Sequence, residues 1–175
     1  ADHMSHKAAV TAWAGAATNA AVHAIDGRRT EARAHTPGTA EVAIESRPPA
    51  PTPQPFGVSD AGAEHLVAQW IRHLGEPDAE TTRYTGDGGI DVQSLHYIAQ
   101  VKNYAGTVGV SELRELGGVA AVDGRRPLFF TSGNFALGAV EFAEKFGIAL
   151  FVYHAADGTL LGANEAARAA IAEGL

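Results

Sequence analysis

The chain has 175 residues, of which 46% are hydrophobic and 19% charged, and its formal net charge is −7. This length and composition indicate one globular domain with an appendage, and they exclude wholesale disorder and a fibrous repeat. The absence of cysteine excludes disulfides, thiolate metal sites and a cysteine nucleophile. The acidic balance argues against a protein that holds nucleic acid by bulk electrostatics alone.

The first 46 residues form an N-terminal segment to which the sequence assigns no function. Residues 1–3 precede a methionine and are interpreted as a tag remnant. Residues 8–25 are alanine-rich with loosely helical apolar spacing, and residues 39–46 could form a strand. The segment has too few large apolar side chains for a core of its own.

A proline-rich stretch separates this segment from the rest of the chain. Residues 47–55 contain five prolines in nine residues, which favours extended polyproline geometry and predicts a linker. The domain proper is therefore predicted at residues 56–175. No apolar run approaches the roughly 18 to 20 residues that span a bilayer, and no signal peptide is recognised. We therefore expect no membrane partner and a cytoplasmic location.

The domain shows strong periodic elements in chain order. A helix capped by Ser59 or Asp60 and ended by Gly75 comes first. Residues 89–95 and 97–104 are almost contiguous and predict an antiparallel hairpin. The other expected elements are a strand at 79–84 before the hairpin, a helix at 111–122, a strand at 127–131, a helix at 136–146, strands at 148–153 and 159–161, and a helix capped by Asn164. The order α, β, β, β, α, β, α, β predicts an α/β domain with a mixed sheet flanked by helices.

Three polar residues of the hairpin are candidates for chemistry. Asp91 lies within an apolar strand, with Ile90 and Val92 predicted on the opposite face. Gln100 and Lys102 are two residues apart and should project from one face of the next strand. If the register turns them toward Asp91, an acid, an amide and an ammonium converge. A buried carboxylate needs a partner, so this arrangement predicts a salt bridge or a metal ion.

A second carboxylate is aimed at the same region. Glu64 falls close to Ile71, at the edge of the apolar stripe of the first helix. Two acids, a main-chain carbonyl and a lysine suit phosphodiester hydrolysis with Mg²⁺. The alternatives are a structural Asp91–Lys102 pair across the hairpin and, for Glu64, a solvated first-turn residue favoured by the helix dipole.

The order of several motifs resembles the Mrr-like restriction endonuclease family of the PD-(D/E)xK nuclease superfamily. The motifs are GDGGID at 86–91, QVK at 100–102, VGV at 108–110, LGG at 116–118, FTSGNF at 130–135 and GIAL at 147–150. The resemblance spans roughly residues 63–161 and so covers the domain without the N-terminal segment. It implies a restriction-endonuclease-like mixed sheet and a Mg²⁺-dependent DNA endonuclease, with Mn²⁺ as a substitute ion.

The resemblance also implies roles for individual residues. Asp91 matches the metal-binding aspartate, and Glu64 matches the acid contributed by the first helix. Gln100 and Lys102 form the Q-x-K version of the acid-x-lysine signature. Because the amide of Gln100 is neutral where the wider superfamily has a carboxylate, we expect weak metal affinity. Asp87 is either a further ligand or a turn residue among glycines.

The end of the strand at 127–131 is a candidate contact for the DNA backbone. Thr131, Ser132 and Asn134 offer hydroxyls, an amide and free N–H groups suited to a phosphate. The alternative is that Ser132 or Asn134 caps the following helix.

The net charge of the domain favours an alternative to the nuclease function. From residue 56 onward eight Lys and Arg residues stand against fifteen Asp and Glu residues, so the whole net charge of −7 lies in the domain. DNA affinity rests largely on phosphate neutralisation. The alternative is therefore a catalytically silent DNA-binding or protein-interaction module. The intact set of Asp91, Gln100 and Lys102 favours the nuclease. Cutting both DNA strands needs two active sites, so a homodimer is plausible, and the N-terminal segment could help to form it.

Overall fold

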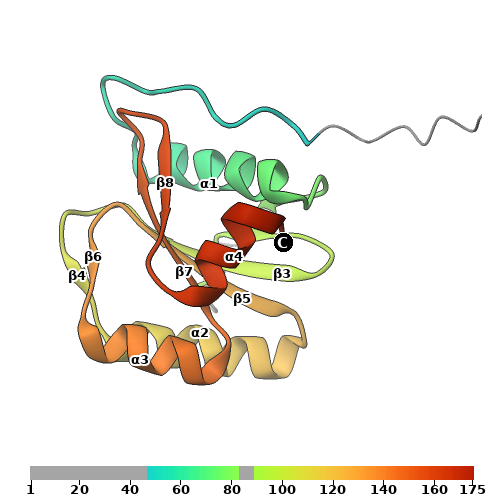
Figure 1. The fold of residues 1–175 in the computed structure, drawn as a ribbon, viewed down its shortest axis with the longest axis vertical. Coiled ribbons are helices and arrows are strands. Elements are labelled where there is room, and N and C mark those ends of the chain that lie inside the picture. The colour runs from blue at the N-terminus through green and yellow to red at the C-terminus, as the bar shows by residue number, and fades with distance from the viewer. Residues whose placement is uncertain (1–46, 83–88) are drawn as a thin grey trace, which may run out of the picture. The chain divides into compact units, whose positions relative to one another are not determined.

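The computed structural model describes residues 47–82 and 89–175 (Figure 1). The chain divides into two units, Ala1–Val42 and Ala43–Leu175. The predictions for residues 1–46 and for Asp87 lie outside the described residues.

A mixed six-stranded sheet forms the centre of the domain, with strand order β1-β2-β3-β5-β7-β8. Strands β1, β2 and β3 are antiparallel, β3, β5 and β7 are parallel, and β8 returns antiparallel to β7. This confirms the predicted α/β fold. The strands are β1 (Glu80–Thr81), β2 (Val92–Gln93), β3 (Tyr97–Lys102), β5 (Arg126–Thr131), β7 (Ala149–His154) and β8 (Thr159–Gly162).

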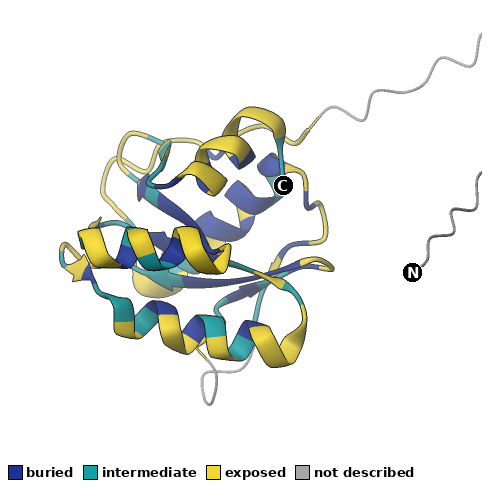
Figure 2. Ribbon diagram, turned by 60° about the horizontal axis from the view of Figure 1, so that its bottom comes forward, coloured by how far each residue is buried: buried dark blue, intermediate teal, exposed yellow. Residues whose placement is uncertain are grey.

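Helices cover both faces of this sheet (Figure 1). Helices α1 (Asp60–Leu74) and α4 (Glu165–Glu173) lie on one face, and α2 (Val110–Asp123) and α3 (Leu137–Phe146) lie on the other. Alternate residues of β3 pack on opposite faces of the sheet. Ala99 packs in the core on the α1 side, and Ile98 packs in the core on the α2 side. Buried residues line the inner surfaces of the helices and the central strands (Figure 2).

The helix starts confirm two predicted caps and correct one. Ser59 accepts a hydrogen bond from the Gly62 N–H at 3.1 Å, and Asn164 accepts one from the Ala167 N–H at 3.1 Å. The alternative that Ser132 or Asn134 caps α3 is wrong, because α3 begins after Ala136 without a side-chain cap.

A second, two-stranded parallel sheet was not predicted. It pairs β4 (Thr107–Val108), which follows β3, with β6 (Asn134–Phe135), which follows β5. The loops after two adjacent strands are thereby fastened together, and Gly133 is required because a side chain there would collide with the Gly106 carbonyl. This small sheet extends the edge at which the parallel strands end.

The hairpin of β2 and β3 is confirmed, but β2 is shorter than predicted. It begins only at Val92, which packs in the core on the α1 side, whereas Ile90 packs against the core on the α2 side. The prediction that Ile90 and Val92 share one face is therefore wrong, since strand alternation does not extend back to Ile90.

The proline-rich stretch has no helix or strand, as expected, yet it lies against the domain. The Pro48 carbonyl is 2.7 Å from His73 Nδ1, the Gln54 N–H donates to the Ala155 carbonyl at 2.7 Å, and Pro51 is buried. At least residues 48–54 thus follow the surface of α1 and the β7–β8 turn. None of the helices in the described ranges is long and apolar enough to cross a membrane.

Candidate active site

The hairpin register places Asp91 beside β3 but not directly opposite Gln100. Val92 pairs with Ala99, and the N–H of Asp91, directly before β2, donates to the carbonyl of the same Ala99 at 2.9 Å, so both residues lie opposite Ala99 as in a β-bulge. Gln100 shares its face of β3 with Ile98, on the α2 side of the sheet. Lys102 ends β3 two residues beyond Gln100. Asp91 and Lys102 are therefore close enough at the end of the central strand for their charges to interact, whereas the predicted convergence of Gln100 with Asp91 does not follow from the register.

The carboxylate of Asp91 is held in place by the neighbouring strand. Its Oδ2 accepts a hydrogen bond from the Val101 N–H at 2.6 Å, and its own N–H donates to the Ala99 carbonyl at 2.9 Å. Burial raises the pKa of Asp91 above its ordinary value, and the Val101 N–H and the Lys102 charge only partly oppose this. The carboxylate is therefore oriented and carries a desolvation cost.

Glu64 lies close enough to Asp91 for the two charges to repel. Burial raises the pKa of Glu64, and the negative charge of Asp91 raises it further. A fully solvated first-turn residue would show neither effect. A carboxylate whose pKa is raised by a neighbouring carboxylate suits a cation shared by the two, which removes the repulsion.

Gln100 carries the clearest sign of a missing partner. The residue is only 6% exposed, and its Oε1 is buried with no hydrogen-bond partner among the described residues. Such an oxygen costs free energy unless it is paired, and an amide oxygen is a suitable ligand for a hard divalent cation. Gly89 fits against this amide, since a Cβ there would lie 2.9 Å from Gln100 Nε2.

The carboxylates of this region offer oxygen ligands to a metal ion. In the part of the chain that the structure describes, no three His, Cys, Asp or Glu side chains form a group that could hold a metal. Asp91 and Glu64 give two carboxylates near each other, and the amide of Gln100 lies toward α2 on the other side of β3. This is the oxygen-rich chemistry that Mg²⁺ prefers, with water completing the coordination.

Lys102 forms no ion pair with the residues that the structure describes. Within residues 47–82 and 89–175 the ion pairs are His96 with Glu76 at 3.0 Å and Arg125 with Asp123 at 2.6 Å. The alternative of a direct structural Asp91–Lys102 salt bridge is therefore not realised, although the Lys102 charge lowers the pKa of Asp91 against its rise on burial.

A third acid at this edge was missed by the sequence analysis. Glu112, in the first turn of α2, accepts a hydrogen bond from the Ser111 hydroxyl at 2.7 Å. That bond lowers the pKa of Glu112, and Lys102 contributes to the lowering. An acid in the first turn of the helix that follows β3 and β4 was the available signal, because the ends of parallel strands and the starts of the following helices share one edge of a sheet.

The predicted phosphate contacts are only partly available. Thr131 is fully buried, and its hydroxyl accepts the Gly133 N–H at 3.0 Å. The Ser132 N–H donates to the Lys102 carbonyl at 3.0 Å, and the Asn134 N–H donates to the Gly106 carbonyl at 2.9 Å. The expectation of free N–H groups is therefore wrong, because these groups form backbone hydrogen bonds between the loops after β3 and β5. The exposed side chain of Asn134 and the half-buried Ser132 remain as predicted contacts.

Fold and site together define an α/β domain of restriction-endonuclease-like architecture, with its polar residues at the end of the central strand. A family model described as restriction endonuclease, of the Mrr catalytic type, matches residues 57–156. The match includes more than half of the chain, and the chain belongs to this family, a family of nucleases. No match was found among curated proteins or among solved structures.

Proposed function

We propose that this protein is a Mg²⁺-dependent DNA endonuclease that hydrolyses phosphodiester bonds in foreign or modified DNA. The observation that carries the proposal is the part-buried carboxylate of Asp91 close to that of Glu64 in a restriction endonuclease domain. Two partly desolvated carboxylates that repel each other are unfavourable in the metal-free protein, and a divalent cation bound by them would remove this penalty.

Asp91, Gln100 and Glu64 would hold the cation, and Mn²⁺ could substitute for Mg²⁺. When bound, the ion polarises the scissile phosphate and makes a water molecule more acidic. The Val101 N–H keeps the Asp91 carboxylate in one orientation. That orientation is fixed before the metal arrives, so less ordering entropy is lost on binding.

Lys102 would act on the phosphate and the attacking water. Since no ion pair occupies its ammonium in the described part of the chain, it is available to stabilise the negative charge that develops on the phosphate. It would also orient or deprotonate the water. Asn134 and Ser132, which follow the neighbouring strand β5, would contact the DNA backbone.

The second candidate function is a silent DNA-binding or protein-interaction module on the same fold. It is favoured by the charge of the domain, which has fifteen acidic and only eight basic residues. This negative net charge opposes tight DNA binding in the absence of a cation. A homodimer would supply the two active sites that double-strand cleavage requires.

Plasmid cleavage separates these two functions. We expect the purified protein to nick or linearise supercoiled DNA in Mg²⁺ or Mn²⁺ and to stop when EDTA is added. Methylated and unmethylated plasmids should be compared, since a restriction-type enzyme can depend on base modification. Metal-independent DNA binding with no cleavage in either metal or methylation state would favour the silent module.

A substitution at Gln100 tests its proposed contact with the ion. Gln100→Glu adds a negative oxygen ligand at nearly unchanged volume, so the Mg²⁺ concentration for half-maximal cleavage should fall by about tenfold, as expected when ligand charge increases. The measurement is a Mg²⁺ titration of initial cleavage rates. Gln93→Glu, on the adjacent strand β2, is the matched control and should leave the requirement unchanged. An unchanged requirement in Gln100→Glu would remove residue 100 from the metal site.

A further inference from the structure

The side chain of Asn103 connects three elements at the edge where the candidate site lies. Its Nδ2 donates to the Val58 carbonyl at 3.1 Å and to Asp60 Oδ1 at 3.2 Å, both at the start of α1. Its Oδ1 accepts a hydrogen bond from the Tyr153 hydroxyl of β7 at 3.0 Å. Asn103 directly follows Lys102, the last residue of β3.

The direction of the amide is determined by its partners. A carbonyl and a carboxylate can only accept hydrogen bonds, so the NH₂ group of Asn103 must face Val58 and Asp60. Tyr153 is fully buried, and burial raises its pKa to about 12, so its hydroxyl remains a donor. An asparagine satisfies all of these partners at once, whereas an aspartate or a leucine does not.

This network bears on Glu64, which lies one helical turn beyond Asp60. Residues four apart on a helix share a face, and the charge of Asp60 contributes to the raised pKa of Glu64. Apolar packing holds α1 against the sheet without strong directionality, whereas hydrogen bonds are directional. The bonds from Asn103 therefore set where the start of α1 lies along the end of β3.

We propose that Asn103 is a positioning residue that holds the start of α1, and through it Glu64, in the register with Asp91 that metal binding requires. This inference rests on the proposed function and adds a residue to it. Asn103 itself contacts neither the ion nor the DNA in this role. Its loss should weaken metal binding beyond any loss of stability.

An exchange of side chains between positions 103 and 60 tests the contact. Asn103→Asp places a carboxylate against the Val58 carbonyl and the Asp60 carboxylate, so α1 should shift and Mn²⁺ affinity should fall by about tenfold, the lower end for loss of a residue that supports a metal ligand. The double variant Asp60→Asn with Asn103→Asp restores a donor facing an acceptor between positions 60 and 103 at the wild-type net charge, while the Val58 carbonyl still faces a carboxylate. It should recover part of the affinity. Asp60→Asn alone keeps a hydrogen-bond acceptor for Asn103 and should bind the ion like wild type.

Tyr153→Phe is the matched control for a purely structural role. It removes the bond to Asn103 from the β7 side and leaves both bonds to α1 intact. Tyr153→Phe should lower the melting temperature without changing Mn²⁺ affinity. Affinity is measured by calorimetric titration of the metal-free proteins well below their melting temperatures, with circular dichroism to confirm folding.

The outcomes are distinguishable. Wild-type affinity in Asn103→Asp, or equal weakening in Tyr153→Phe, overturns the positioning role while leaving the proposed function intact. A double variant that binds Mn²⁺ no better than Asn103→Asp also overturns it. A wild-type protein that neither binds Mn²⁺ nor cleaves DNA overturns the proposed function itself, and the positioning role with it. If Asn103→Asp does not fold, Asn103→Ser removes the amide without adding charge and should show the same loss of affinity.

Discussion

Asp91→Asn should abolish cleavage while leaving the metal-free protein folded and as stable as wild type or slightly more stable. The asparagine Oδ1 can still accept the Val101 N–H, so the strand contact survives. The substitution removes a desolvated charge and its repulsion with Glu64. It also removes a charged metal ligand, and we expect cleavage to fall by roughly 10²- to 10⁴-fold, the scale on which a catalytic group contributes.

The pH dependence of stability gives the same prediction a second readout. Folding raises the pKa values of Asp91 and Glu64, so the folded state favours their protonated forms. The stability that this protonation contributes is complete below the unfolded-state pKa values, near pH 4, and is lost as the pH rises through the raised values. Metal-free wild type should therefore lose stability across this range, and Asp91→Asn should lose less. Thermal melts at several pH values in EDTA measure this.

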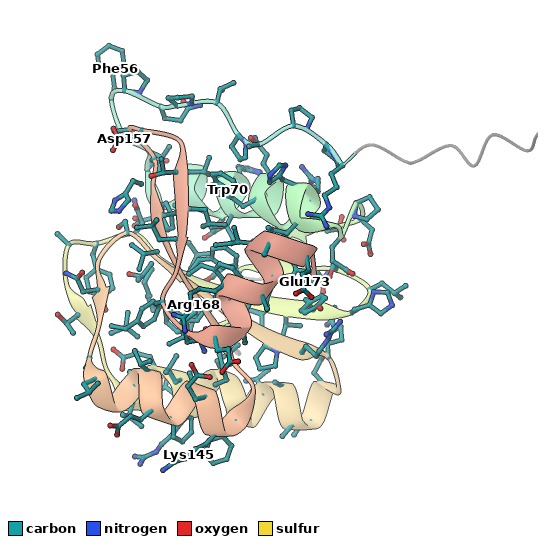
Figure 3. The ribbon with its side chains drawn as sticks, viewed as in Figure 1. Phe56, Trp70, Lys145, Asp157, Arg168 and Glu173 are labelled. Carbon is teal, nitrogen blue, oxygen red and sulfur yellow. The ribbon has the colours of Figure 1, made fainter. Side chains whose placement is uncertain are left out.

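Two controls separate the charge from the hydrogen bond at Asp91. Asp91→Ala leaves the Val101 N–H without its partner and should destabilise the protein by about 1 to 3 kcal/mol. Asp157→Asn changes an exposed carboxylate at the β7–β8 turn, far out on the hairpin (Figure 3), and should alter neither cleavage nor pH dependence. If Asp91→Asn instead lowers the melting temperature sharply in EDTA, Asp91 has a structural role and the metal assignment loses its basis.

Added Mg²⁺ should stabilise the wild-type protein and not Asp91→Asn. A ligand that binds only the folded state raises its stability in proportion to the logarithm of its concentration above the dissociation constant. Melting temperatures measured across a Mg²⁺ series therefore report binding without DNA. Ca²⁺ in the same series shows whether the site discriminates by ion size, since Mg²⁺ demands shorter bonds and stricter geometry.

Lys102→Ala should lower the cleavage rate by roughly 10²- to 10⁴-fold without affecting folding. No ion pair within the described ranges involves Lys102, and the residue is only partly buried, so stability should change by no more than about 0.5 kcal/mol. The measurements are single-turnover cleavage at saturating Mg²⁺ and thermal melting. Lys102→Arg keeps the charge but not the compact ammonium, and we expect it to rescue DNA binding more than cleavage.

Lys145→Ala is the matched control for charge. Lys145 is an exposed lysine in the last turn of α3, on the outer side of the domain (Figure 3). Its removal lowers the net charge by the same amount and should leave the cleavage rate unchanged. Equal losses in Lys102→Ala and Lys145→Ala would show that general electrostatics decide the activity, in which case Lys102 has no specific role in the chemistry.

The sequence by itself determined the elements whose signals are local. Apolar periodicity located α1, and the short polar side chains of Ser59 and Asn164 located the starts of α1 and α4, because a cap bonds to N–H groups only two or three residues away. Continuous apolar residues located β5 between its helices. The order of the motifs was sufficient to indicate the family that the family model confirms.

Only the tertiary structure decided which groups meet at the edge of the sheet. The two-residue strands β4 and β6 have no periodicity of their own, and they pair because β3 and β5 are neighbours. The loops after β3 and β5 use the N–H groups that the sequence left free after Thr131. The same edge brings Glu112 near Lys102 and Asn103 against the start of α1. Hydrogen-bond partners far apart in the sequence follow from strand order and register, and a residue pattern along one segment carries no record of either.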